Sequence, residues 1–287
     1  MTEAAAQPSN DELKERIRRQ WQTIAPAWDR WTPVLSDWLA PVTDAMVRAA
    51  AIAPGQRVLD VAAGAGEPAL TIAQRVGPTG SVVATDLSDA ILAYAAGRAR
   101  DASLANVETH VMDGERLDLP DASLDAAVSR LGVIYFPDRP RAVAEMHRVL
   151  RRGGRIAIAG ITNPAANPFS AATFAVIAAR AGLPRPAPNA PGPYSMGSPD
   201  VMTGVLAGAG FVDVRADIVD APLRLRSAED AAQLQREAFG FDGMLGGLPP
   251  AEREATWAEV VAALRAFETT DGFESPAQFI VGSGRKG

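Results

Sequence analysis

The sequence contains no cysteine and only two histidines, His110 and His147, among its 287 residues. Without cysteine there is no disulfide, no thiolate metal site and no cysteine nucleophile. Two histidines are too few for a histidine-based metal cluster, so we expect no metal. His147 shares a helical stripe with apolar residues and His110 lies within a predicted strand, which favours structural roles for both. The sequence therefore identifies no catalytic residue.

Positive charge and long apolar runs are also lacking. The formal net charge is −6 and the isoelectric point is near 5.1, which disfavours a nucleic-acid partner. No apolar run reaches the length of a membrane span. The segment MTEAAAQPSNDELKER has no apolar stretch of the kind found in secretory signals. We expect a cytoplasmic protein that binds neither nucleic acid nor membranes; the sequence leaves a homodimer open.

What the sequence does contain is a regular alternation of strand-like and helix-like segments. Five short β-branched runs alternate with helical stretches, at residues 57–61, 81–86, 107–112, 124–129 and 155–160. This spacing predicts right-handed βαβ units and a parallel sheet. Two later runs, at 211–225 and 277–281, predict strands that close the sheet with an antiparallel edge. The predicted fold is α/β: a Rossmann-like, seven-stranded, mostly parallel sheet with helices on both faces.

We divide the chain into three parts. Residues 1–53 have a helical pattern, interrupted at Pro26, Pro33 and Pro41, and hold four of the five tryptophans. This N-terminal helical extension either anchors short helices to the main domain or forms a lid over a ligand, and both interpretations stay open. Residues 54–162 are predicted to form the nucleotide-binding core. Residues 163–287 are predicted to add a helical insertion and the strands that complete the same sheet.

A glycine turn follows the first predicted strand, in Val58–Glu67 (VLDVAAGAGE). Gly64 and Gly66 lack a Cβ atom, so the backbone can bend tightly there and a ligand can approach it closely. In an open parallel sheet this turn lies where the strand order reverses, which is the usual ligand site. The pattern Gly64-x-Gly66-x-x-Ala69 also fits the loose dinucleotide motif, but that motif alone is weak evidence.

Three aspartates stand at the carboxyl ends of three successive strands. Asp60 directly precedes the glycine turn, where it would attract an ammonium group and repel a pyrophosphate. Asp86 can accept from both ribose hydroxyls, and Asp113 can accept from the exocyclic amine of adenine. Each acid alone could be a loop-capping or turn residue. Together they match a ligand with a cation, a sugar diol and an aminopurine, which indicates S-adenosylmethionine (SAM) rather than a dinucleotide.

Four segments of the sequence then resemble a known family: VLDVAAGAGEPAL, VVATDLSDAIL, VMDGERLDLPDASLDAAVSRLGVIYFPD and AVAEMHRVLRRGGRIAI. They are similar to successive motifs of the class I SAM-dependent methyltransferases, above all the ubiquinone/menaquinone-biosynthesis type and its small-molecule relatives. The resemblance is dense over residues 54–162 and weaker in the flanks. It implies a SAM-dependent methyltransferase with S-adenosylhomocysteine as product, and it is silent about the acceptor.

The resemblance also implies roles for individual residues: Asp60, Ala62, Gly64 and Gly66 at the methionine moiety, Asp86 at the ribose with Leu87 beside the adenine, Asp113 and Gly114 at the adenine edge, and Ser129 and Arg130 at the methionine end of the cleft. This loop has Ala63 and Ala65, where relatives often have Cys or Gly and Thr or Ser. These are conservative differences that should leave cofactor binding intact. Glu67 is either a second acid near the amino group or an exposed first-turn residue favoured by the helix dipole. Arg130 is either a site residue or the partner of a nearby acid.

Methyl transfer from a sulfonium is an in-line displacement, so the protein mainly has to align the reactants and exclude water. With no convincing base, an already nucleophilic O, C or N atom of a small, largely apolar acceptor fits best. Six side chains are predicted to line the acceptor, although each could be ordinary core: Trp28, Trp31, Tyr135, Phe169, Tyr194 and Met196. The alternatives are an NAD(P)-dependent oxidoreductase, or a protein of this fold that acts as a cyclase or as a non-catalytic partner.

Overall fold

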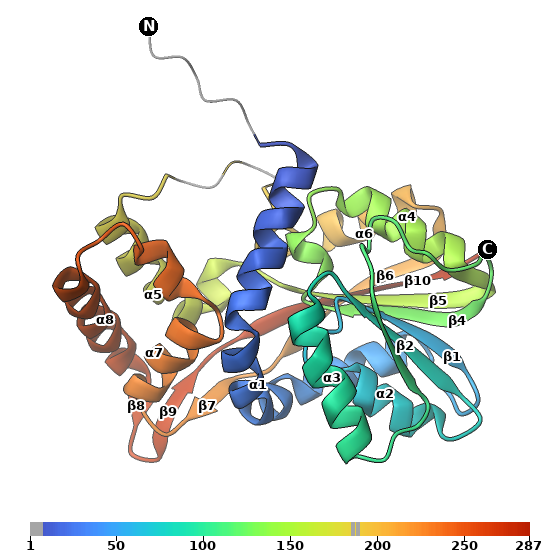
Figure 1. The fold of residues 1–287 in the computed structure, drawn as a ribbon. Helices are drawn as coiled ribbons and strands as arrows, with labels where there is room; N and C mark the ends of the chain where they lie inside the picture. Colours follow the sequence, from blue (N-terminus) through green and yellow to red (C-terminus); the bar gives the residue numbers. More distant parts are fainter. Residues whose placement is uncertain (1–7, 185–186, 188–189) are drawn as a thin grey trace, which may run out of the picture.

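The computed structural model describes residues 8–184, 187 and 190–287, so the first seven residues of the predicted N-terminal part lie outside it (Figure 1). A seven-stranded sheet has the order β3-β2-β1-β4-β5-β10-β6. Its strands are β1 (Arg57–Val61), β2 (Ser81–Asp86), β3 (Val107–Val111), β4 (Leu124–Arg130), β5 (Leu150–Ile161), β6 (Phe211–Asp220) and β10 (Gln278–Lys286). Only β10 runs antiparallel to its neighbours, β5 and β6. The predicted mostly parallel, seven-stranded sheet is confirmed.

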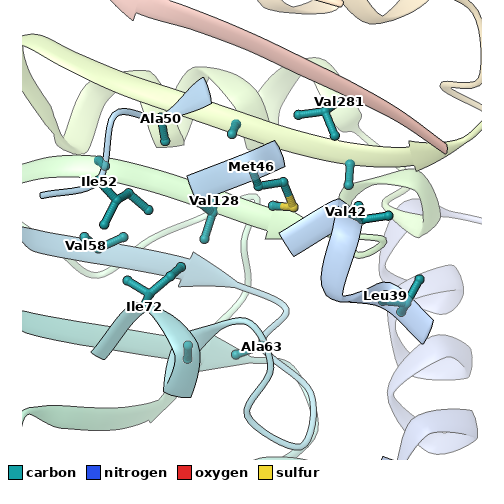
Figure 2. Close-up of a cluster of buried hydrophobic side chains, with 14 of the residues drawn as sticks. Leu39, Val42, Met46, Ala50, Ile52, Val58, Ala63, Ile72, Val128 and Val281 are labelled. Atoms are coloured by element: carbon teal, nitrogen blue, oxygen red, sulfur yellow. The ribbon is translucent and has the colours of Figure 1, made fainter. Parts of the chain in front are cut away.

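Helices cover both faces of this sheet because successive strand residues point to opposite sides. On one face, Val58 and Ala157 pack with α2 (Ala69–Val76) and the C-terminal half of α1 (Figure 2). On the other face, their neighbours Leu59 and Ile158 pack with α4 (Arg139–Val149) and α6 (Pro199–Gly208). Helix α3 (Asp89–Asp101) lies beside α1. The predicted helices on both faces are therefore present.

The N-terminal segment is one helix, α1 (Asn10–Ala49), with Pro26, Pro33 and Pro41 inside it. The prediction that these prolines interrupt the helix was wrong. Each proline removes one backbone hydrogen bond, but α1 is held along its length by packing against α3 and against β5 and β10. The helix is bent rather than straight (Figure 1), as internal prolines favour.

A second cluster of elements packs beside the sheet: α5 (Pro168–Ala181), α7 (Ala228–Glu237), α8 (Pro250–Leu264) and a small sheet of β7 (Leu223–Leu225), β9 (Gly272–Ser275) and β8 (Glu268–Thr269). Its own apolar core includes Phe169, Leu234 and Phe273, and Leu35 of α1 joins it. The prediction of one strand over 211–225 was wrong. Pro222 has no N–H for a ladder, so β6 ends at Asp220 and β7 joins the small sheet.

Four short 3-10 helices complete the connections: η1 (Val133–Tyr135), η2 (Pro164–Ala166), η3 (Phe241–Leu245) and η4 (Arg265–Phe267). Across the described part of the chain, no helix combines the length and the apolar character that a bilayer crossing requires.

Candidate cofactor and acceptor site

The strand order reverses between β1 and β4, and the predicted site residues stand at the carboxyl ends of β1 to β4. Ligands bind at such a reversal because the connections leave it in opposite directions and open a crevice. Two non-glycine residues have positive φ at this edge, Ala62 at 58° and Leu131 at 62°. Strained backbone of this kind persists only where the surrounding structure enforces it, and it is common at functional sites.

The glycine turn after β1 needs its glycines. Gly64 has φ +57° and Gly66 has φ +114°, which residues with a Cβ rarely adopt. A methyl group on Gly66 would also lie 3.3 Å from the Cα of Ala95 in α3. The Gly64 N–H donates to Oδ2 of Asp86 at 3.0 Å, which ties the turn to the end of β2. The turn is thus held close to the second predicted cofactor residue.

Asp60 is fully buried, and neither of its carboxylate oxygens has a hydrogen-bond partner of normal geometry among the residues described. Burial raises the pKa of Asp60 well above its ordinary value; the Arg130 charge and the Ala69 N–H offset only part of this rise. A buried acid without partners destabilises the ligand-free protein. Such a group is suited to a ligand that brings its own cation.

Arg130, at the end of β4, lies close to the same acid. Its Nη1 donates to Oγ1 of Thr43 in α1 at 2.9 Å, and its Nη2 donates to the carbonyl oxygen of Glu67 at 3.1 Å. Burial lowers the pKa of Arg130, and the carboxylates of Glu67 and Asp60 work in the opposite direction. The Glu67 carboxylate accepts from the Thr71 hydroxyl at 2.8 Å. Both interpretations of Arg130 and of Glu67 stay predictions.

Asp86 accepts two backbone hydrogen bonds, from Gly64 to Oδ2 and from Ser88 to Oδ1 at 2.9 Å. Burial raises its pKa to about 6, even though these N–H groups favour the charged form. Leu87, partly buried, directly follows it. A carboxylate fixed in this way presents its remaining lone pairs in a defined direction, as recognition of a diol requires.

Asp113 lies just beyond β3, and its Oδ1 accepts from the N–H of Glu115 at 2.9 Å. Its Oδ2 accepts from Nζ of Lys14 in α1 at 2.8 Å. The neighbouring Gly114 cannot carry a side chain, because a Cβ there would lie 2.5 Å from Cε2 of Phe136. A polar cavity of about 330 Å³ adjoins this point, lined by residues that include Lys14, Asp113 and Glu115.

One of the predicted acceptor residues, Trp28, lies at the glycine turn, and a second, Tyr135, is connected to it through Trp21. A methyl group built on Gly64 would be 3.9 Å from Nε1 of Trp28. The Trp28 ring packs edge-on against Trp21, with centroids 5.1 Å apart, and Trp21 lies 6.4 Å from Tyr135 of η1. Helix α1 thus brings Trp28 over the turn, and Tyr135 stands on the far side of Trp21.

The other predicted acceptor residues are more dispersed. Phe169 of α5 packs against Trp38, with centroids 6.3 Å apart. Trp31 donates from Nε1 to Oε2 of Glu237 at 2.8 Å. Tyr194 is partly buried and lies near Tyr135, whose pKa is raised mainly by burial and further by Tyr194. Met196 is fully buried in the core on the α4 and α6 face, a placement that does not favour an acceptor contact.

Comparisons with known proteins show the family to which the central part of the chain is similar. A family model described as "Methyltransferase domain" matches residues 58–154. The chain is 34% identical over 152 residues to the ubiquinone/menaquinone biosynthesis C-methyltransferase UbiE of Bordetella parapertussis; the match covers 53% of this chain and 58% of that protein. It is 33% identical over 186 residues to the nocamycin O-methyltransferase of Saccharothrix syringae, covering 61% and 66%. The chain contains a class I SAM-dependent methyltransferase domain.

Each of these two matches covers less than two thirds of the relative's own length. Solved structures extend the likeness of the methyltransferase fold beyond the matched domain. The [4+2]-cyclase SpnF superposes with a TM-score of 0.56 at 20% identity, over 93% of this chain and 97% of that one. Haemonchus contortus phosphoethanolamine N-methyltransferase 2 has a TM-score of 0.55 at 17% identity, over 98% and 61%. At these identities the likeness concerns the fold alone.

The structure adds residues to the methyltransferase site that the sequence did not identify. Lys14 of α1 donates a hydrogen bond to Asp113, and Thr43 of α1 accepts one from Arg130. Because each pair is far apart along the chain, no local sequence pattern could have predicted these contacts. Gly132, two residues after β4, packs so closely against the glycine turn that a Cβ there would lie 2.4 Å from the Cβ of Ala62. A glycine directly after a predicted strand was a signal that could have been used. The cofactor and acceptor roles of the predicted residues remain proposals.

Proposed function

We propose that this protein transfers a methyl group from SAM to a small, largely apolar acceptor. The observation that carries the proposal is the buried carboxylate of Asp60 at the end of β1 of a methyltransferase domain, whose oxygens have no hydrogen bond of normal geometry in the described part of the chain. The ammonium group of a bound SAM would supply the hydrogen-bond donors that the Asp60 oxygens lack. This fit is supported by the neighbouring glycine turn, which lets a ligand approach the backbone.

The remaining cofactor residues fit the same ligand. Asp86 would accept from the ribose hydroxyls, with Leu87 beside the adenine. Asp113 and Gly114 would hold the adenine edge once Oδ2 of Asp113 is released from Lys14. Ala62, Gly64, Gly66, Ser129 and Arg130 would surround the methionine end. When bound, SAM supplies a methyl group on a sulfonium, a good leaving group that needs no activation by the protein.

The residues of the chain then act by positioning. Trp28, which lies at the turn, and Trp21, which packs against it, are large, flat and weakly polar, and they would exclude water from the reacting atoms. Burial raises the pKa of Tyr135 to about 12 and that of Tyr194 to about 12, so neither is a base near neutral pH. An acceptor that is already nucleophilic, such as an activated phenol, an enol carbon or an amine, therefore fits best.

His110 and His147 do not change this conclusion. The His110 side chain is half exposed and lies 3.6 Å from Glu108 on the outer strand β3. His147 packs edge-on against Phe211, with ring centroids 4.8 Å apart. One of the two relatives is named a C-methyltransferase and the other an O-methyltransferase. Because the two names differ, they do not indicate which atom this protein methylates. A cytoplasmic location, a homodimer and the division at residues 53 and 162 also remain proposals.

The other two functions are less well supported. In an NAD(P)-dependent oxidoreductase, Asp60 would face a pyrophosphate, and burial would strengthen the repulsion. The likeness to a cyclase concerns its fold alone.

Binding and turnover test the proposal in sequence. In a calorimetric titration, wild-type protein should bind SAM and S-adenosylhomocysteine but not NAD. Asp86→Ala should weaken this binding by about 1–3 kcal/mol through lost hydrogen bonds, whereas Asp101→Ala, on the exposed end of α3, should not. Transfer of label from methyl-labelled SAM to members of a phenol, enol and amine library would then establish turnover. Binding of NAD in preference to SAM would refute the proposal.

A further inference from the structure

Strand β6 forms one edge of the seven-stranded sheet and is paired there with β10 alone. In an antiparallel pair, the backbone N–H and C=O groups of successive residues point alternately toward the partner strand and away from it. The Ala221 N–H donates to the carbonyl oxygen of Ala277, the residue before β10. By this alternation, the backbone groups of Val214, Ala216 and Ile218 point outward. Among the residues described, these outward groups form no hydrogen bond with another segment.

The side chains of this edge strand differ between its two faces. Val214 and Ala216 pack on the face that carries α4 and α6, and Ile218 lies on the same face, opposite Ile280 of β10. Ile218 is nevertheless 46% exposed, which is unusual for a large apolar side chain in a sheet. On the other face, Arg215 and Asp217 are exposed, and neither has an ion-pair partner within the described part of the chain.

This pattern is complementary to itself when a second copy of β6 pairs antiparallel in a register centred on Ala216. Arg215 of each copy then faces Asp217 of the other, and Val214 faces Ile218. A register centred on Arg215 or on Asp217 would instead bring two like charges directly opposite each other, which is unfavourable. A register centred on Ile218 would leave both charged residues without an opposite charge. One register therefore satisfies the exposed charges and covers the exposed isoleucine.

We propose that the outer edge of β6 binds a second copy of this chain across a two-fold axis at Ala216, so that the two sheets become one. Three facing pairs would form about six backbone hydrogen bonds. A bulge at Asp213, where φ is 54° and the register with β10 shifts, ends the regular edge. The contact is therefore short, and the dimer should dissociate on dilution. Strands β5 and β10 separate this edge from β1 to β4, so cofactor binding should not depend on it.

Charge reversal tests the register. Sedimentation velocity at about 5 to 200 μM protein should show wild type shifting from monomer to dimer as its concentration rises. Arg215→Asp and Asp217→Arg each place like charges opposite one another, so each variant alone should dimerise about tenfold more weakly. An equal mixture of the two variants should recover the wild-type dimer, because every acid then faces a base. Glu108→Arg makes the same charge change as Asp217→Arg on the opposite edge strand, β3, and should dimerise like wild type.

Backbone pairing has its own measurement. The outward amides of Val214, Ala216 and Ile218 should exchange with deuterium more slowly as the protein concentration rises. Ala216→Pro removes an outward N–H and leaves the bonds to β10 in place, so it should abolish the dimer. The inference is wrong if wild type stays monomeric, if either charge variant alone dimerises like wild type, or if their mixture stays monomeric. A titration with S-adenosylhomocysteine checks that each variant is folded, and it tests the proposed function separately from the dimer.

Discussion

Nζ of Lys14, in the second turn of α1, lies 2.8 Å from Oδ2 of Asp113 and 2.6 Å from Oε2 of Glu115. Two more polar contacts join α1 to α3: Gln22 with Asp89 at 2.6 Å, and Asp29 with Arg98 at 2.7 Å. These contacts hold the N-terminal half of α1 beside the strand ends that carry the predicted cofactor residues. Opening of this half of α1 would break these contacts, which water can replace, together with its apolar packing against the glycine turn and α3.

Loss of the Lys14 contacts should therefore speed cofactor entry. Lys14→Met should raise the association rate of S-adenosylhomocysteine about two- to fivefold, since a partly exposed ion pair contributes up to about 1 kcal/mol. Stopped-flow tryptophan fluorescence measures this rate, and raised salt should have the same effect on wild type. Arg16→Met, exposed on the same helix, is the control. An association rate that Lys14→Met leaves unchanged would show that α1 does not limit entry.

Cofactor affinity should depend on pH because burial raises the pKa of Asp86 to about 6 in the ligand-free protein. The ionised form accepts from hydroxyl groups, and it is lost as the pH falls. Ionisation of Asp86 by itself should thus leave the affinity for S-adenosylhomocysteine constant above about pH 7 and lower it by up to about tenfold per unit below 6. Burial also raises the pKa of Asp60, which steepens the fall. Asp86→Asn should lower the plateau and leave a shallower profile in calorimetric titrations from pH 5 to 8.

Asp60 should cost the ligand-free protein stability. Its folded pKa lies above the unfolded value, so the folded state disfavours the charged form at high pH, and the cost disappears below the unfolded value of 3.8. Asp60→Asn should raise the free energy of unfolding by about 1–2 kcal/mol at pH 8 and by little near pH 4, while SAM binding is lost. Urea unfolding at both pH values measures this. Equal stabilisation at both would assign the gain to packing instead.

Two glycine substitutions should have effects of opposite sign. Gly132→Ala would place a Cβ 2.4 Å from the Cβ of Ala62 and 2.8 Å from Oγ of Ser129, so it should destabilise the protein by about 1–3 kcal/mol and weaken cofactor binding. Gly97→Ala, in α3, meets nothing closer than 3.9 Å. It should stabilise the protein by about 0.5–1 kcal/mol. Thermal unfolding of the two variants measures these changes. An unchanged melting temperature for Gly132→Ala would show that the turn after β4 can shift to accept the added methyl group.

Strand periodicity was sufficient to place Asp60, Asp86 and Asp113 at neighbouring strand ends, because parallel strands joined by helices have few possible arrangements. It was not sufficient for α1, where packing on both sides keeps Pro26, Pro33 and Pro41 inside one helix. It also missed the break at Pro222, where the chain leaves the large sheet for a small one.

The sequence alone therefore determined the family, the sheet and the identity of the acids at its edge, since these follow from local patterns repeated along the chain. Only the tertiary structure decided that Asp60 is fully buried with no hydrogen bond of normal geometry among the described residues, and that Lys14 bonds to Asp113. The physical reason is that burial and hydrogen bonding depend on residues far apart in the chain, which Lys14 and Asp113, 99 positions apart, illustrate.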